Sequence, residues 1–116
     1  CIKAANFSKN EVPTSIISVY KTYENYVAAM YYNAGVIYRN QNKRFDEVRI
    51  YQKILETTPD HSRTHLSLGF AYYSGEGISM NKYKAYEHWN IAAKQGDEGA
   101  QMALYLLCNE SPWACK

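Results

Sequence analysis

The hydrophobic positions of this chain follow a helical period over most of its length. Between residues 13 and 40, apolar side chains recur at alternating steps of four and three residues, which places them on one face of an α-helix. They are Ile16, Tyr20, Tyr23, Val27, Met30, Ala34 and Ile37. The spacing fits one long helix or two helices that meet near Tyr26. The first breaker is the run Asn40-Gln41-Asn42.

Four further amphipathic segments follow, separated by residues that cap or break helices. Pro59 ends the second segment, after which Asp60 or Ser62 can cap the third helix. The third segment ends in Gly75 and Gly77, which permit the positive φ angles of a turn. The apolar positions are Phe45, Val48, Tyr51 and Leu55 in the second segment, and Leu66, Leu68, Phe70, Tyr72 and Tyr73 in the third.

The fourth and fifth helices are bounded in the same way. Asn81 can cap the fourth helix, and Gly96 is the residue type that usually follows a helix end. Asp97 can cap the fifth helix, and Pro112 prevents its continuation. No segment alternates with the period of two that a strand requires. The pattern therefore predicts an all-α fold of about five helices.

An internal repeat relates the first half of the chain to the second. Gly35 and Gly69 lie 34 residues apart in matching contexts, which are Tyr31-x-x-Ala34-Gly35-x-x-Tyr38 and His65-x-x-Leu68-Gly69-x-x-Tyr72. This resembles the tetratricopeptide pattern, in which the glycine lets the two helices of a hairpin approach. One departure is Glu47, which stands where the family expects a small residue, while Val48 looks like its replacement one place later. The turn between these helices is therefore expected to be one residue longer than usual.

The next unit is similar to a Sel1-like repeat, a longer relative of the tetratricopeptide hairpin. The matching residues are Leu68, Gly69, Tyr72, Gly75, Gly77, Ile78, Lys84, Ala85, Trp89, Ala92, Ala93, Gln95, Gly96 and Ala100. Leu104 and Tyr105 stand where the next Leu-Gly pair would fall, which suggests a terminal cap. The resemblance covers residues 28 to about 108. It implies a right-handed α-α superhelix in which each hairpin buries its apolar face against its neighbour.

The composition indicates a folded domain with an interaction surface. A length of 116 residues is typical of one domain. The formal net charge of +2 gives no strong field, so neither nucleic acid nor an anionic membrane surface is favoured as the main partner. No apolar run is long enough for a transmembrane helix. The count of 12 tyrosines is unusually high. A side chain with an apolar body and a polar tip suits a surface that binds a protein or peptide, so this count favours an interaction surface.

The candidates for chemistry are few. His61 and His65 are spaced so that both could bind a metal ion from one helical face, but no nearby carboxylate or cysteine completes a ligand set. His65 and His88 occupy positions where the repeat wants bulky packing residues. The sequence contains neither a glycine-rich phosphate loop nor a nucleophile elbow. We therefore expect no metal site, no cofactor and no enzymatic activity.

The resemblance implies a concave binding surface lined by the first helix of each hairpin. Counting from each Ala-Gly or Leu-Gly pair carries the groove positions of the family onto this chain. In the first unit they are Tyr32, Asn33, Val36, Arg39 and Asn40, and in the second they are Arg63, Leu66, Phe70, Tyr73 and Ser74. Aromatic and arginine side chains are enriched among interface anchors. The alternative is that Tyr32, Phe70 and Tyr73 are covered by the first helix or the C-terminal tail and belong to the core.

The cysteines suggest an oxidising compartment. Cys108 and Cys115 are close enough in the tail to form a disulfide; two reduced thiols in a cytosolic protein are the alternative. Cys1, followed by a loosely patterned polar stretch, resembles the acylated first cysteine of a mature bacterial lipoprotein; a cloning boundary is the alternative. Residues 1–12 are then expected to be a flexible lead-in, which in the lipoprotein interpretation is the linker, ahead of a repeat domain over residues 13–116.

Three functions are compatible with these features. The favoured one is an adaptor of the bacterial envelope, in the periplasm or anchored by lipid to the outer membrane, that binds a protein or peptide through its concave face. The second is a periplasmic immunity protein that neutralises a toxic effector. The third is a pilotin-like assembly factor for an envelope machine. In each case a lipid anchor is the expected contact with the membrane, and the fold alone does not separate the three.

Overall fold

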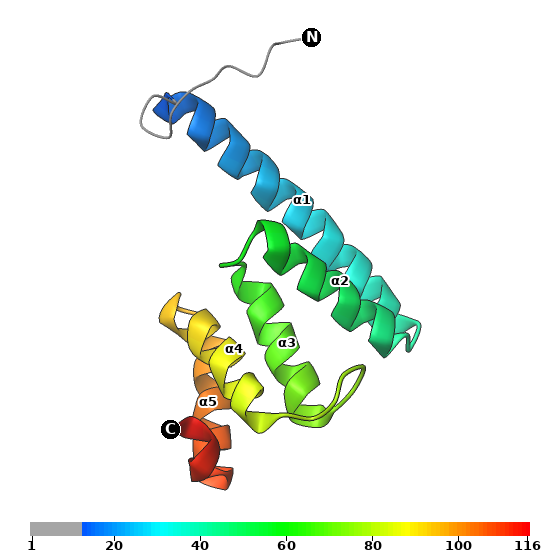
Figure 1. Ribbon diagram of the computed structural model, residues 1–116, viewed down its shortest axis with the longest axis vertical. Helices are drawn as coiled ribbons and strands as arrows, with labels where there is room; N and C mark the ends of the chain where they lie inside the picture. Colours follow the sequence, from blue (N-terminus) through cyan, green and yellow to red (C-terminus); the bar gives the residue numbers. More distant parts are fainter. Residues whose placement is uncertain (1–12) are drawn as a thin grey trace.

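The computed structural model describes residues 13–116, and over that range it consists of helices and contains no strand (Figure 1). The elements are α1 (Thr14–Asn40), α2 (Arg44–Thr57), α3 (Ser62–Ser74), α4 (Lys82–Lys94), α5 (Glu98–Glu110) and the short 3-10 helix η1 (Pro112–Cys115). The prediction of an all-α fold with five α-helices is confirmed. The first helix is continuous rather than divided near Tyr26. The predicted lead-in and its Cys1 lie outside the described residues.

The caps predicted for the last two helices are present. The Asn81 side chain accepts a hydrogen bond from the backbone N–H of Lys84 at 3.1 Å. The Asp97 carboxylate accepts one from the backbone N–H of Ala100 at 2.8 Å. Each cap satisfies a backbone donor that has no partner inside the helix, which is why these local signals can be read from the sequence.

The cap predicted for the third helix was wrong. The helix begins at Ser62, so the preceding residue is His61 rather than Asp60. The Nδ1 atom of His61 accepts a hydrogen bond from the backbone N–H of Thr64 at 3.3 Å and lies 2.7 Å from the Thr64 hydroxyl. A histidine ring nitrogen can therefore take the role that short polar side chains usually have at this position.

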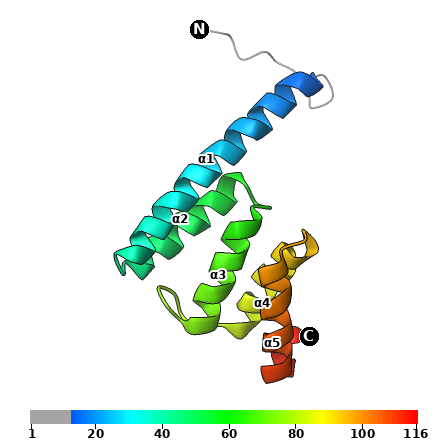
Figure 2. The ribbon, with the colours of Figure 1, turned by 180° about the vertical axis from the view of Figure 1, so that it is seen from behind.

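The helices pack as two hairpins, α1 with α2 and α3 with α4, and α5 lies against α4 (Figures 1 and 2). Both hairpins have a close approach at the glycine of the internal repeat. A Cβ atom at Gly35 would lie 2.3 Å from Cε1 of Tyr51, and one at Gly69 would lie 2.2 Å from Nε1 of Trp89. In each hairpin the aromatic ring of the second helix thus lies where a larger residue on the first helix would have its side chain.

Two groups of buried side chains form the core, and α3 contributes to both. The first group joins α1, α2 and α3 and consists of Ala28, Val48, Tyr51, Ile54 and Leu68. The second joins α3, α4, α5 and η1 and consists of Tyr72, Ala85, Trp89, Ala92, Ala100, Ala103, Leu107 and Ala114. Because Leu68 and Tyr72 are one helical turn apart, α3 connects the two groups.

The face of α1 that packs against the protein is not the apolar face identified in the sequence. Ala28 and Gly35 are the buried residues of α1, whereas Tyr23, Met30 and Ile37 are more than half exposed. Small residues seven positions apart let α2 approach the α1 backbone, and the large apolar side chains then point away from α2. Most of the predicted apolar stripe is therefore left exposed by the described part of the chain, and only Val27 and Ala34 of it are half-buried.

Candidate functional site

A cleft of about 280 Å³ lies where α1, α2 and α3 meet. The residues that line it come from the C-terminal part of α1, from α2, from α3 and from the loop after α3. They are Arg39, Arg44, Glu47, Tyr51, Ser67, Phe70, Ala71, Tyr73, Ser74 and Glu76. We call this set the α1–α3 cleft.

A buried carboxylate organises the floor of the α1–α3 cleft. Glu47 is 4 % exposed and accepts hydrogen bonds from Nε of Arg39 at 2.7 Å and from Nη1 of Arg44 at 3.2 Å. Nη2 of Arg39 also lies 3.4 Å from the Tyr51 hydroxyl. Burial, and next the Glu47 carboxylate, raise the pKa of Tyr51, so this phenol remains protonated. Both arginines are therefore held in place by a charge that is itself shielded from water.

The α1–α3 cleft is close to neutral but still has donors to offer. Arg44 makes a second ion pair with the half-exposed Glu76, at 3.1 Å, so two arginines face two glutamates. The side chains of Arg39 and Arg44 remain 39 % and 38 % exposed. A guanidinium has five N–H groups, of which the described contacts use two in each arginine. Donors therefore remain for a carboxylate or carbonyl oxygen of a ligand.

The other wall of the α1–α3 cleft is aromatic. Phe70 is 50 % exposed and packs edge-on against Trp89, with 5.0 Å between the ring centroids. Tyr73 is half-buried, and its hydroxyl donates to the carboxylate of Glu110 at 2.5 Å. Lys82, at the start of α4, also bonds Glu110 at 2.9 Å, so Glu110 joins the end of α5 to the end of α3 and to the start of α4. An aromatic surface next to arginine donors suits a peptide segment in which an acidic residue lies close to an apolar one.

The structure brings together four of the ten residues predicted for a groove, which are Arg39, Phe70, Tyr73 and Ser74. The remaining six do not line the α1–α3 cleft. Asn33, Asn40 and Arg63 are exposed, while Val36 and Leu66 are half-buried, and Tyr32 is part of the packing. The predicted groove residues that line the α1–α3 cleft thus lie toward the C-terminal ends of α1 and α3.

Tyr32 follows the alternative in which a predicted groove residue belongs to the core. Its ring stacks on Tyr51 at 5.2 Å between centroids, and its hydroxyl is 2.9 Å from the Ser67 hydroxyl. It therefore joins α1 to α2 and α3 instead of facing a ligand. Phe70 and Tyr73 differ from it, because both keep part of their rings in the α1–α3 cleft.

The residues that form the cleft floor were not among those predicted for the groove. Arg44, Glu47 and Tyr51 belong to α2, whereas the family positions were counted only on the first helix of each hairpin. The signal that could have found them was Glu47, which departs from the small residue of the repeat. A charged residue at a packing position requires partners of opposite charge, and Arg39 and Arg44 supply them.

A pair of histidines, the buried His65 and the half-buried His88, connects α3 to α4, where the sequence had indicated only packing. Nε2 of His65 is 2.7 Å from the carbonyl oxygen of Pro59, so it carries the proton and donates. Nδ1 of His65 then accepts from Nδ1 of His88 at 2.9 Å. His88 stacks on Tyr72, with 5.5 Å between ring centroids. Burial lowers the pKa of His88 to about 4, and the charges of His65 and Lys84 act in the same direction.

We expect this pair to make the protein less stable in mild acid. His88 is neutral in the folded chain down to about pH 4, whereas in the unfolded chain it takes up a proton below its ordinary pKa near 6.5. The stability that depends on a neutral His88 is therefore fully present above pH 6.5 and is lost as the pH falls toward 4. The loss should be about 1–2 kcal/mol, since solvent screens a half-buried ring. Urea unfolding at a series of pH values measures it.

The control for this prediction is His88→Phe, which keeps a ring on Tyr72 and removes the titrating group. The variant should show a shallower dependence of stability on pH. Some dependence should remain, because burial also lowers the pKa of His61. If wild type and variant lose the same stability between pH 7 and 4, His88 is not responsible.

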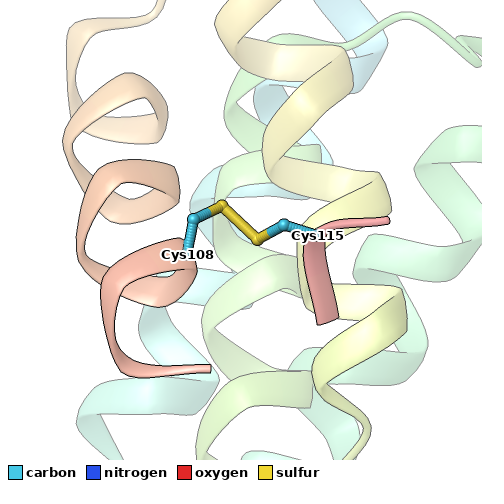
Figure 3. The surroundings of a disulfide bond; sticks show 2 residues. All are labelled: Cys108 and Cys115. Carbon is cyan, nitrogen blue, oxygen red and sulfur yellow. A yellow bond between two sulfur atoms is a disulfide. The ribbon is translucent and has the colours of Figure 1, made fainter. Parts of the chain in front are cut away.

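A disulfide fastens the C-terminal tail (Figure 3). Cys108 on α5 is bonded to Cys115 on η1, and their Cα atoms are 5.7 Å apart. This is the pair expected from the sequence. Within the closed loop Ala114 is buried, and Ser111 receives a hydrogen bond from Nζ of Lys82 at 3.2 Å. The bridge therefore holds η1 where it covers the second core group.

Residues 13–116 offer no candidate for a metal site or for a membrane-spanning helix. No cluster of three or more histidine, cysteine, aspartate or glutamate side chains in that range is arranged to hold a metal ion. None of the helices described is both long and apolar enough to cross a membrane.

In comparisons with known proteins, no protein-family model, no curated protein and no solved structure matched the chain.

Proposed function

We propose that this protein is an adaptor of the bacterial envelope that binds an extended segment of a partner protein in the α1–α3 cleft. The observation that carries the proposal is the arrangement of Arg39 and Arg44 around the buried Glu47, beside the half-exposed ring of Phe70. Four residues that the tetratricopeptide and Sel1-like resemblance assigns to a groove line this same cleft.

The chemistry of the α1–α3 cleft suggests what the segment contains. A carboxylate of the segment can compete with Glu76 for Arg44, because Glu76 is half exposed and its bond to Arg44 is open to solvent. An apolar side chain can cover Phe70. Glu47, in contrast, is buried and keeps the arginines oriented when a ligand arrives, which lowers the entropy lost on binding.

The compartment in the proposal is supported by the covalent chemistry of the tail. A disulfide such as Cys108–Cys115 persists in oxidising surroundings, including the bacterial periplasm, and is rare in the cytosol. The resemblance of Cys1 to an acylated lipoprotein cysteine fits the same compartment. Mass spectrometry of the native protein would test both, because it reports acylation at Cys1 and the redox state of the tail together.

Selection of peptides from a displayed library on the full chain tests the binding function. Enriched peptides should share an acidic residue near an apolar one. Their affinity, measured by fluorescence anisotropy, should fall at least about tenfold in Phe70→Ala, a loss of about 1.4 kcal/mol. Phe45→Ala is the matched control, because Phe45 is 68 % exposed on α2 outside the α1–α3 cleft and should leave the affinity unchanged.

A second pair of variants tests the role of charge without removing a packed ring. Ser74 is exposed at the edge of the α1–α3 cleft. Ser74→Glu should repel an acidic ligand, whereas Ser74→Gln adds similar bulk without charge and should weaken binding less. The proposal is overturned if no peptide is enriched, or if enriched peptides bind Phe70→Ala and Ser74→Glu as tightly as wild type.

A further inference from the structure

The outer face of α1 is an apolar surface without a partner in the described chain. It consists of Ile16, Val19, Tyr20, Tyr23, Tyr26, Val27 and Met30, which we call the α1 seam. Tyr20, Tyr23 and Tyr26 are 65 %, 66 % and 67 % exposed. In both views of the ribbon, the N-terminal half of α1 extends beyond α2 (Figures 1 and 2). A helix with this many exposed large side chains is typical of an interface.

We propose that the α1 seam joins two copies of this chain as an antiparallel helix pair. The first argument is area. A fully exposed tyrosine carries on the order of 200 Å², so the seven partly exposed side chains together offer on the order of 800 Å². That is about the area which each subunit contributes to a stable interface of standard size.

The second argument is that the α1 seam is complementary to itself. A two-fold axis beside Tyr23 reverses the helix direction, so a residue before Tyr23 faces one at about the same distance after it. Tyr23 then meets Tyr23 of the second copy. Ile16 meets Met30, so aliphatic side chains face each other at both ends of the pair.

The intermediate positions of the α1 seam match in size. Val19 and Tyr26 lie on one side of the helix face, and Tyr20 and Val27 lie on the other. In the antiparallel pair, each tyrosine therefore meets a valine of the second copy. Aromatic and β-branched side chains fill such a space without two large rings competing for it.

The third argument is charge. Between residues 14 and 30 the charged residues are Lys21 and Glu24, and neither belongs to the α1 seam. Both instead line a hollow shared with the α2–α3 turn. No like charges therefore meet when two seams pack. The proposed pair also leaves the α1–α3 cleft accessible, because its residues lie on other faces of the protein.

Analytical ultracentrifugation of the full chain tests the proposal. From about 1 to 100 µM, a range suited to interfaces of this area, the mass should rise toward twice the chain mass of 13.4 kDa. Tyr23→Glu places two carboxylates on the two-fold axis and should weaken the dimer at least about 100-fold. Phe45→Glu, at a similarly exposed ring on α2, should leave the dimer intact.

Disulfide cross-linking tests the antiparallel orientation of the two α1 helices. In a Cys1→Ser background, Tyr23→Cys should give a dimer linked by a disulfide on oxidation, because residue 23 of both copies lies at the axis. Lys21→Cys, on the opposite side of α1, should not. A chain that stays monomeric throughout, a dimer that survives Tyr23→Glu, or equal cross-linking at both positions would overturn the proposal. Peptide affinity per chain should be unchanged in Tyr23→Glu, which separates this test from that of the α1–α3 cleft.

Discussion

Replacing Gly69 by alanine is expected to lower the free energy of unfolding by about 2–3 kcal/mol, although alanine is the better helix former. An added Cβ would lie 2.2 Å from Nε1 and 2.3 Å from Cδ1 of Trp89. Trp89 is 2 % exposed and cannot turn away into solvent. It must shift, which also strains its hydrogen bond of 3.1 Å to the carbonyl oxygen of Leu66. Thermal and urea unfolding measure the loss.

The matched control is Gly99→Ala on α5. There the nearest atoms to an added Cβ are the Asp97 carboxylate at 3.2 Å and Leu66 at 3.7 Å. Stability should change by less than about 1 kcal/mol, because the variant gains helix propensity and displaces only the tip of Asp97, which caps α5, instead of a buried ring. In a Trp89→Leu background, where the ring is absent, Gly69→Ala should lower the free energy of unfolding much less than it does in wild type. Equal effects of the two glycine variants would contradict this account of the α3–α4 hairpin.

Removing the disulfide with Cys108→Ser and Cys115→Ser should lower the free energy of unfolding by about 2.5 kcal/mol in the chain-entropy model for so short a loop. For a domain of this size, the melting temperature should fall by roughly 10 °C. Part of the change comes from the tail, since Ala114 is buried in the second core group and can leave it once η1 is released. Calorimetry with and without reductant measures the loss.

Cys1→Ser is the control for this prediction, because it changes a cysteine and leaves the bridge intact. It should melt like wild type under oxidising conditions, and a reductant should bring wild type to the level of the double variant. A double variant that melts with wild type would show that the bridge stabilises only η1 and not the domain.

The parts of the fold that the sequence predicted correctly are those with local causes. The side-chain oxygens of Asn81 and Asp97 each accept a hydrogen bond from the backbone N–H three residues later. Such a cap forms within one short segment, so it can be predicted without knowing the rest of the fold. Gly35 and Gly69 could be recognised because they lie 34 residues apart in matching sequence contexts, and in the structure each lies against an aromatic ring of the next helix. These are rules of spacing, and one sequence is sufficient to apply them.

The parts that the sequence did not predict depend on residues far apart in the chain. The packed face of α1 was set by where α2 can approach Ala28 and Gly35, and not by the most regular apolar stripe. The contact of His65 with His88 spans 23 positions and two helices. The charge network around Glu47 needed both the turn after α1 and the loop after α3 to bring its arginines and glutamates together. The periodicity of apolar residues along one helix carries no information about contacts between residues far apart in the chain.

The position of α3 between the two core groups has a consequence for how the sequence can change over evolutionary time. Buried residues of this helix, among them His65, Leu68 and Tyr72, face different neighbours within two turns. A substitution there must suit one hairpin without disturbing the other, so few exchanges are neutral. Helix α5, which contacts a single hairpin, can accept new residues at positions other than its buried residues Ala100, Ala103 and Leu107 and the bridged Cys108. Divergence among descendants of this chain should therefore gather at positions that face solvent while the middle helix stays nearly fixed.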